Sequence, residues 1–395
     1  MMRYDAVIAG ARCAGAATAL LIARAGGRVL VLDQGAYGSD TLSTHALMRG
    51  AIVQLHRWGV LPAIEAAGTP PIRSTTFSYA DRDVTVAIEP KYGVSALYAP
   101  RRALLDRVLA DAAMEAGAAF RYRSVVEEVL FDARGRACGV VVRENGSTER
   151  IAADLVIGAD GRHSTIARRV GAVTLREARH ATGVLYTYWD GLDGDGYYWG
   201  YRKGVSIGLI PTNDGATCLF VSVPWTRFHS ELQGPAHTTY HRFIRSAFGA
   251  VDRRLRLARP MAAVRGFAGQ HGYIRQGSGP GWALVGDAGY FKDPLTAHGI
   301  TDALRDAELL ARAAIRGTTD AFAQYEIIRV NLSSRLFEIT DEIASFPSDE
   351  TVLQSLHREF SREMAREVRM LAALDPLSSP APLPLPVPVA MRCGS

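Results

Sequence analysis

The stretch YDAVIAGARCAGAATALLIARAGGRVLVLD, residues 4–33, decides the fold class of this 395-residue chain. Its apolar runs at residues 4–9 and 28–32 predict strands, and the Ala/Leu-rich segment that ends at residue 25 predicts a helix between them. A helix that crosses over between two strands joins them in parallel and in the right-handed sense. The chain is therefore expected to begin with a βαβ unit of the α/β class.

The turn inside this unit carries the first motif, Gly10-Ala-Arg12-Cys-Ala-Gly15, and Asp33 ends the second strand. Gly10 permits a tight turn, Gly15 permits close helix–strand packing, and the helix N-terminus attracts a pyrophosphate. Asp33 can accept from ribose hydroxyls, and an acidic residue here disfavours a 2′-phosphate. This context predicts a Rossmann-type dinucleotide site, although an α/β crossover without a nucleotide remains the alternative.

Arg12 departs from the usual motif, which has a second glycine where the backbone approaches the pyrophosphate. Its guanidinium can compensate by pairing with a phosphate, or it can point to solvent. Both alternatives stay open.

Two further motifs follow strands downstream. The first is Gly158-Ala-Asp160-Gly161-Arg162, and the second is Gly286-Asp287-Ala-Gly289, which precedes Pro294 and a helix from Gly299. Alone, each is compatible with an ordinary strand-to-loop turn.

Together, the three motifs resemble those of the flavoprotein monooxygenases of the p-hydroxybenzoate hydroxylase type over residues 3–316. The resemblance implies FAD, with the ADP half at the first motif, Asp160 touching FAD and the pyridine nucleotide, and Asp287 on the ribityl chain. Arg102 stands where the family has a flavin-contacting arginine, because Arg102, Leu105, Asp106 and Leu109 repeat its spacing; a solvated arginine at a helix start is the alternative. The expected cofactor-binding residues are Gly10, Arg12, Gly15, Asp33, Gln34, Thr44, Arg102, Val126, Asp160, Gly161, Gly286, Asp287, Pro294, Gly299 and Ile300.

The third motif also departs from the family. Gly-Asp-Ala-Ala-His is replaced by Gly-Asp-Ala-Gly-Tyr at residues 286–290, and Ala297 and Thr301 replace a glycine and an asparagine. Asp293-Pro294 is similar to the corresponding pair of flavin-dependent halogenases and geranylgeranyl reductases. The halogenase Trp-x-Trp-x-Ile-Pro motif is absent, and none of the three lysines matches the catalytic lysine of those enzymes.

The remaining patterns predict how the chain is organised. Apolar periodicity favours helices at 44–58, 103–116, 299–316 and through much of 321–374, and Asn145-Gly146 favours a tight hairpin turn. We expect a Rossmann-type FAD-binding domain with an interleaved β-sheet substrate domain and C-terminal helices. The expected parts are an FAD-binding part at 1–75, substrate-domain strands at 76–100, an FAD-binding part at 101–180, the substrate-binding sheet at 181–275, an FAD-binding part at 276–316, helices at 317–375 and a Pro-rich tail at 376–395.

Aromatic residues gather in the expected substrate sheet. Those that can line a cavity, or simply fill a core, are Tyr186, Tyr188, Tyr198, Trp199 and Phe220. By the resemblance, His45 and His298 pass near the flavin ring, where each can orient a phenol or satisfy a backbone carbonyl. The candidate catalytic residues are His45, His298, Tyr186 and Trp199, and no metal constellation is expected.

The resemblance implies a monooxygenase. NAD(P)H would reduce FAD, O₂ would add to give a flavin hydroperoxide, and its distal oxygen would pass to an electron-rich aromatic ring. The alternatives are an FAD-dependent reductase, dehydrogenase or halogenase, or a nucleotide-binding protein without catalysis.

Composition limits the partners. The chain has 48% hydrophobic and 22% charged residues, and its net charge of +5 is spread without a run of five basic residues, so nucleic acid is not expected. Four distant cysteines and the lack of a secretory signal favour the cytoplasm. The apolar stretch at 13–23 is too short to span a membrane, so no membrane partner is expected. The expected state is a monomer or a homodimer.

Overall fold

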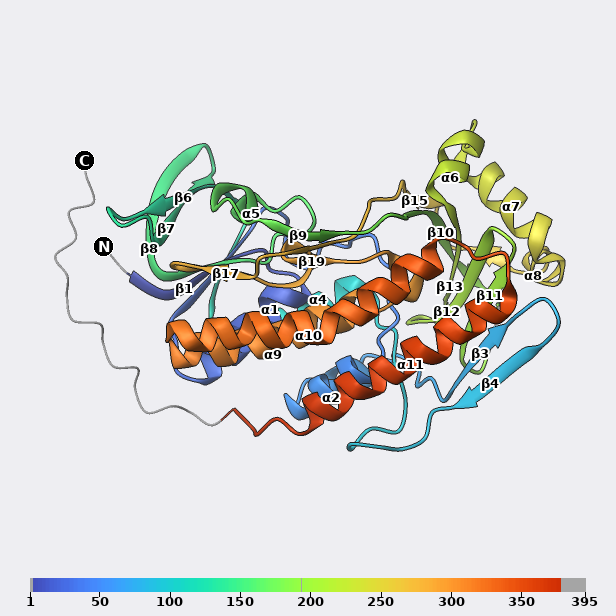
Figure 1. The fold of residues 1–395 in the computed structure, drawn as a ribbon, viewed down its shortest axis with the longest axis horizontal. Helices are drawn as coiled ribbons and strands as arrows, with labels where there is room; N and C mark the ends of the chain where they lie inside the picture. Colours follow the sequence, from blue (N-terminus) through green and yellow to red (C-terminus); the bar gives the residue numbers. More distant parts are fainter. Residues whose placement is uncertain (1–2, 193, 378–395) are drawn as a thin grey trace.

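The computed structural model describes residues 3–192 and 194–377, and its first sheet starts with the opening βαβ unit (Figure 1). This unit consists of β1 (Arg3–Ala9), α1 (Cys13–Arg24) and β2 (Val29–Asp33). The two strands pair in parallel, with Ile8 opposite Val31, as the sequence predicts. Every residue of α1 except Arg24 is buried, because the helix lies between the sheet and other helices.

Strands from distant parts of the chain complete the parallel layer. Its order is β18 (Trp282–Leu284), β8 (Ser147–Gly158), β1, β2 and β5 (Ala119–Tyr122). Ala9 and Gly158 lie opposite each other at the ends of β1 and β8, so the first two motifs leave the sheet side by side. A Cβ on Gly10 would lie 2.3 Å from the carbonyl oxygen of Ala159, which explains why this turn requires glycine.

An antiparallel extension continues this sheet through β7 (Ala137–Glu144) and β6 (Ser124–Phe131). Asn145 and Gly146 join β7 to β8 with φ values of 50° and 81°. Positive φ at both positions is what a type I′ hairpin turn needs, so the predicted hairpin is confirmed.

A second sheet forms the other end of the molecule. Its strand order is β14 (Arg259–Pro260), β10 (Thr182–Asp190), β13 (Thr217–Pro224), β12 (Val205–Pro211), β11 (Tyr197–Arg202), β3 (Ser74–Ser78) and β4 (Asp83–Ala87), with β15 (Arg265–Phe267) also on β10. A small third sheet joins β19 (Tyr290–Phe291), β16 (Tyr273–Arg275) and β9 (Thr174–Glu177).

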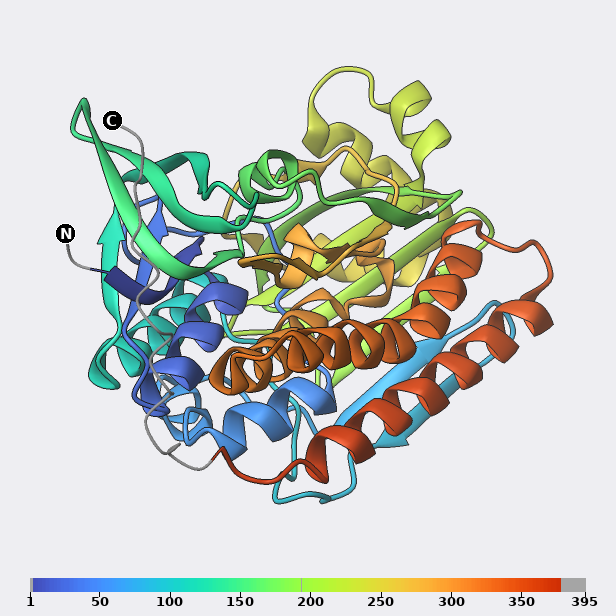
Figure 2. The same cartoon turned by 60° about the vertical axis from the view of Figure 1, so that its left-hand side comes forward.

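Helices cover the sheets. Figure 1 shows α6 (Trp225–Glu231), α7 (Ala236–Ala247) and α8 (Gly249–Leu255) outside the second sheet, on its side away from the first. α1 packs on β1 and β2 and also contacts α9 (Gly299–Arg316) and α4 (Arg102–Glu115), while α5 (Thr165–Arg169) follows β8. Figure 2 shows α11 (Glu350–Ala372) running beside α10 (Thr319–Ala344) and the β3–β4 hairpin, and α11 also contacts α2 (Arg49–Arg57). This arrangement confirms the predicted fold class.

The predicted helix at 44–58 is wrong at its start. His45 has φ of 68°, a left-handed conformation that cannot continue an α-helix, and α2 begins only at Arg49. Residues 44–48 instead run as a loop towards the start of α9, where the backbone N–H of Met48 donates to Thr301 Oγ1 at 3.2 Å.

Two other expectations stay predictions. The boundaries between the FAD-binding and substrate parts are not settled by this architecture, and most of the Pro-rich tail at 376–395 lies outside the described residues. In the described parts of the chain, no helix is both long and apolar enough to cross a bilayer.

Candidate functional site

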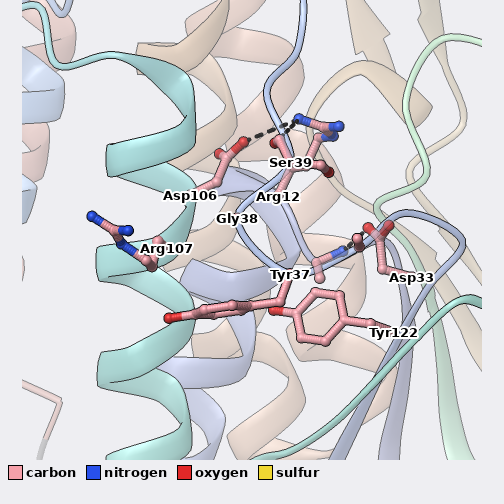
Figure 3. A pocket seen from close by; sticks show the side chains of 10 residues that line it. Arg12, Asp33, Tyr37, Gly38, Ser39, Asp106, Arg107 and Tyr122 are labelled. Atoms are coloured by element: carbon pink, nitrogen blue, oxygen red, sulfur yellow. Dashed lines mark hydrogen bonds and ion pairs between the residues drawn. The ribbon is translucent and has the colours of Figure 1, made fainter.

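The first motif borders a surface pocket between the β1–α1 turn and α4 (Figure 3). Asp33 accepts hydrogen bonds from the backbone N–H groups of Ala11 and Gly35, both at 2.7 Å. These bonds orient the carboxylate while each oxygen keeps a lone pair for a further donor. The pocket is lined by Ala11, Arg12, Asp33, Ala36, Tyr37, Gly38, Ser39, Asp106, Arg107 and Tyr122.

Arg12 turns towards α4 (Figure 3). Its Nη1 lies 3.3 Å from Asp106 Oδ2, and its side chain is 36% exposed. Arg102 bonds the same carboxylate through Nη2 at 3.1 Å, and the backbone N–H of Cys13 donates to it at 3.0 Å. Two guanidinium groups thus share one carboxylate, which leaves positive charge for an anion at the N-terminus of α1.

Asp160 accepts hydrogen bonds from residues at the start of α5. Its carboxylate accepts from Ser164 Oγ at 2.5 Å and from the backbone N–H of Thr165 at 2.7 Å. Burial raises the pKa of Asp160, and these hydrogen bonds oppose that effect. The neighbouring Gly161 has φ of 75°, and a Cβ added to it would meet no atom within 4 Å, so backbone is what this motif presents to open space.

Asp287 is differently placed, because no hydrogen bond joins its carboxylate to a described residue. Burial raises the pKa of Asp287 to about 6, although Arg162 and Arg102 partly oppose the rise. Gly286, with φ of 58°, lets the chain turn against Ala14 of α1. The carboxylate is therefore available to hydroxyl donors of a bound molecule.

His45 and Tyr188 form a buried pair beneath Arg101. His45 Nε2 is hydrogen-bonded to the Tyr188 hydroxyl, and the Arg101 guanidinium lies 3.8 Å from the centroid of the Tyr188 ring. Burial, with the nearby Arg101 and Arg102, lowers the pKa of His45 to about 3, and burial raises that of Tyr188 well above its usual range. The pair is thus neutral at physiological pH, with His45 held in a rare left-handed conformation.

An aromatic row crosses the second sheet on the face that belongs to the apolar core shared with α1 and α2. Tyr186 of β10 opposes Phe220 of β13, and Trp199 of β11 opposes Gly208 of β12. The Phe220 ring fills the space over Gly208, where a Cβ would lie 2.2 Å from it. Tyr198 points to the other face and packs with the helices α7 and α8, because neighbouring strand residues alternate, so its predicted place in the cavity is wrong.

A buried charge cluster surrounds the start of α9. Lys292 Nζ donates to Asp302 Oδ2 at 2.6 Å and lies 3.0 Å from His298 Nδ1. Arg305 Nη1 bridges Asp302 Oδ1 at 3.0 Å and Glu367 Oε1 at 2.9 Å. All five side chains are at most 5% exposed, and Glu367 comes from α11, so the cluster ties the last helix to the residues before Gly299.

The charged neighbours in this cluster also shift the pKa of His298. Burial and Lys292 would lower its pKa, but Asp302 and Glu367 outweigh them and raise it. The ligand atoms of these three residues lie within 4.8 Å of one another, close enough to hold a metal ion. Lys292 and Arg305 already bind the two carboxylates, however, and a divalent cation would have to displace them, so we assign no metal here.

The four candidate catalytic residues therefore do not form one site. Tyr186 lies beside the His45–Tyr188 pair, because its ring meets the Tyr188 ring edge-on with 6.0 Å between centroids, and the backbone N–H of Ser43 donates to its hydroxyl at 3.4 Å. Trp199 lies further along the row with its Nε1 bound to Thr75 Oγ1 at 3.0 Å, and His298 lies in the charge cluster.

The other predicted cofactor residues occupy varied positions. Gly299 is exposed with no atom within 4 Å of its would-be Cβ, and Thr44, Pro294 and Ile300 are partly buried. Gln34 is exposed, and Val126 of β6 packs on the apolar cluster of the first sheet. Their roles stay predictions.

Sequence reasoning missed Arg101, Lys292 and Glu367. Arg101 adjoins Arg102 and had a local signal in that pair of arginines. Glu367 had none, because 62 residues separate it from Arg305.

These residues fit a flavin dinucleotide. Arginines gather at the N-terminus of α1, Asp33 lies at the end of β2, the Asp287 carboxylate has no protein donor among the described residues, and open backbone lies at Gly299. They are the groups that pyrophosphate, ribose, ribityl chain and ring would need.

Comparisons with known proteins agree with this fit. Residues 3–336 match the family described as "FAD binding domain". The chain is 26% identical over 366 residues to menaquinone reductase of Mycolicibacterium smegmatis, covering 87% of this chain and 84% of that protein. It is 25% identical over 340 residues to digeranylgeranylglycerophospholipid reductase 1 of Methanococcoides burtonii, covering 78% and 73%.

Solved structures share the fold. The flavin-dependent brominase Bmp2 superposes with a TM-score of 0.80 at 18% identity, over 94% of both chains. At this identity the likeness concerns the fold alone.

Proposed function

Because the chain belongs to the FAD binding domain family, we propose that it is an FAD-dependent monooxygenase that hydroxylates an aromatic small molecule with NAD(P)H and O₂. The observation that carries the proposal is the buried Tyr188–His45 pair under Arg101, next to the aromatic row of the second sheet. A flat, apolar wall with one polar corner suits a ring that carries a hydroxyl group.

The residues of the first sheet would hold FAD. Arg12 and Arg102 would face the pyrophosphate, Asp33 and Asp287 would accept from hydroxyl groups, and Gly299 would allow close approach of the ring. When bound, FAD would supply the electron transfer and the activation of O₂.

The polar corner would orient the substrate. In the tautomer of neutral His45 whose Nε2 accepts a hydrogen bond from the Tyr188 hydroxyl, the Tyr188 oxygen would keep lone pairs for a substrate hydroxyl. The Arg101 guanidinium over the Tyr188 ring would add positive charge beside the oxygen of a substrate hydroxyl, and so help to hold that group at this corner.

The apolar face would exclude water. Tyr186, Trp199 and Phe220 are at most 5% exposed and belong to the same core as α1 and α2. A dry site protects a reactive oxygen species from wasteful breakdown.

Reduction of an apolar substrate is the second candidate. Its support is that the similar curated proteins named above are reductases, and that Asp293 precedes Pro294. Halogenation has less support, because Lys292 is buried in an ion pair with Asp302 and the other two lysines are at exposed positions.

Labelled oxygen separates the two candidates. The full chain with FAD and NADPH would be incubated with a panel of phenols under ¹⁸O₂, and products analysed by mass spectrometry. Hydroxylation predicts one ¹⁸O atom in the product and none formed under nitrogen. A product that forms equally well under nitrogen assigns the protein to the reductases.

Tyr188→Phe tests the corner. It keeps the ring under Arg101 but removes the hydroxyl, and we expect product formation to fall roughly 10²-fold with FAD content unchanged. Tyr240→Phe is a matched control, since the Tyr240 hydroxyl is buried on the opposite face of the sheet, where it contacts Trp189 and the backbone.

A further inference from the structure

Although the chain has no run of five basic residues, its excess of positive charge is not spread evenly and is concentrated in one segment. The whole protein has a formal net charge of +5. Residues 225–265, which form α6 to α8 and the strands that follow, contain eight arginines and only two acidic residues, Glu231 and Asp252, a net charge of +6. The rest of the chain is therefore nearly balanced, and the excess positive charge lies in this segment.

The arginines of this face are exposed. The side chains of Arg245, Arg256 and Arg259 are 68%, 70% and 77% exposed. The acidic groups are too few to neutralise them, because Asp252 is shared between Arg245 and Arg256, at 3.5 and 3.3 Å.

Acidic residues are also too few to neutralise the other arginines of this segment. Glu231 is shared between Arg227 at 2.7 Å and Arg242 at 3.7 Å, and Asp190 pairs with Arg259 at 2.9 Å. Arg253 is exposed and takes part in none of these pairs. We call this set of arginines on α7, α8 and the segment after them the arginine-rich face.

The arginine-rich face contains a hollow of about 720 Å³. It is lined by residues of α7 and α8, the helices that Figure 1 shows outside the second sheet, away from the first sheet. Its lining is mostly basic or hydroxylic and consists of His237, Thr238, His241, Arg242, Arg245, Ser246, Asp252, Leu255 and Arg256. Forked guanidinium groups around a hollow suit a phosphate group.

Apolar side chains accompany the charges. Leu257 is 91% exposed, the most exposed large apolar side chain among the described residues, and it stands between Arg256 and Arg259. Met261, Trp225 and Leu232 add exposed fractions of 44%, 43% and 37%. An exposed leucine gains little from contact with a nucleic acid, whereas the interfacial region of a bilayer binds both arginine and leucine side chains.

We propose that the arginine-rich face docks on an anionic phospholipid bilayer, with headgroup phosphates at the hollow and Leu257 in the interfacial region. This departs from the sequence expectation of no membrane partner, which rested on the lack of a spanning segment. Docking does not depend on the function proposed above.

The location connects docking to the candidate site. The backbone N–H of Met261 donates to the carbonyl of Tyr188 at 2.9 Å, and β15 pairs with β10 at Tyr186. The segment after α8 thus borders the strand that carries both tyrosines. A docked molecule would hold this strand near the bilayer, from which a lipid-soluble substrate can arrive.

Vesicle co-sedimentation tests the proposal with the full chain. We expect binding to vesicles of 30% phosphatidylglycerol in phosphatidylcholine at 0.1 M salt, and loss of binding on pure phosphatidylcholine or at 0.5 M salt. Arg253→Gln and Leu257→Gln should each lower the partition coefficient about five-fold. Arg150→Gln and Ile327→Gln, exposed residues elsewhere, are the matched controls and should bind like the wild type.

Three results would overturn the proposal. They are no binding to either vesicle, equal binding to both vesicles, and equal loss of binding in the control variants. A DNA duplex serves as a further arm: if it binds as tightly as the anionic vesicles and Leu257→Gln leaves both affinities unchanged, the face attracts any polyanion and the lipid assignment fails. Thermal melting of each variant verifies that it is folded.

Discussion

The Asp287 carboxylate makes the protein without cofactor less stable at high pH. Its pKa is raised from 3.8 to about 6, so ionisation costs the folded state free energy. Because the pKa is raised on folding, the cost is absent below pH 4 and complete above pH 6. Asp287→Asn removes it, and should make the apoprotein about 3 kcal/mol more stable than wild type at pH 8 and equally stable at pH 4. Urea unfolding at both pH values measures this, and an equal difference at both would contradict it.

The same residue should matter most for FAD affinity. Asp287→Ala is expected to weaken FAD binding by roughly 1.5–3 kcal/mol. No described residue donates to this carboxylate, so a ribityl hydroxyl would be its hydrogen-bond donor, and the alanine variant would lose that bond. Asp160→Ala should weaken it less and instead lower stability, since that carboxylate caps α5. Fluorescence titration of FAD into each apoprotein decides, and equal affinity in both variants and wild type would refute the assignment.

His45 combines a strained backbone with a neutral ring. With a pKa of about 3, His45 does not titrate near neutrality. The pH profile of kcat/KM between about pH 5.5 and 7.5 should therefore be the same in shape for the wild type and for His45→Asn. Asn tolerates the left-handed conformation better than Ala, so His45→Ala should unfold about 1 kcal/mol more easily than His45→Asn. Chemical denaturation and pH profiles measure both effects, and a wild-type inflection near pH 6.5 that disappears in His45→Asn would contradict the assignment.

At the level of elements, Glu367 connects α11 to the start of α9. Glu367→Gln removes the charge that faces Arg305 and His298, and should lower the free energy of unfolding by about 3 kcal/mol, as for other broken buried ion pairs. Glu363→Gln, on the same helix but in a surface pair with Arg366, should cost less than about 0.5 kcal/mol. Urea midpoints that shift equally in the two variants would show that the buried cluster contributes no more than a surface pair.

How far elements were predictable depends on whether their signals were local. The β1–α1–β2 unit and the Asn145-Gly146 hairpin follow from periodicity and turn residues within a few positions, and both are confirmed. The loop before α2 was missed, because its apolar spacing resembled that of a helix and the enrichment of histidine at positive φ is too weak to predict a break. The contact of Glu367 with Arg305 was beyond reach, since only the packing of α11 brings them together.

At the scale of the whole molecule, the two large sheets carry different groups of candidate site residues. The first sheet and its helices gather the groups that fit FAD, and the second sheet presents the aromatic row and the Tyr188–His45 pair. The three ordered motifs could be read from the sequence because each follows a strand of the same sheet. The polar corner could not, because it combines a loop residue, His45, with a strand residue 143 positions away.

The most direct test of the central claim is the absorbance of the purified full chain during NADPH oxidation in air. We predict a flavin spectrum with one FAD per chain, and NADPH oxidation with matching O₂ consumption that an accepted phenol accelerates above the background rate. A colourless protein that fails to take up added FAD would contradict the assignment of FAD as the cofactor. A flavoprotein that passes electrons to its substrate without consuming O₂ would retain the fold and cofactor but overturn the hydroxylation.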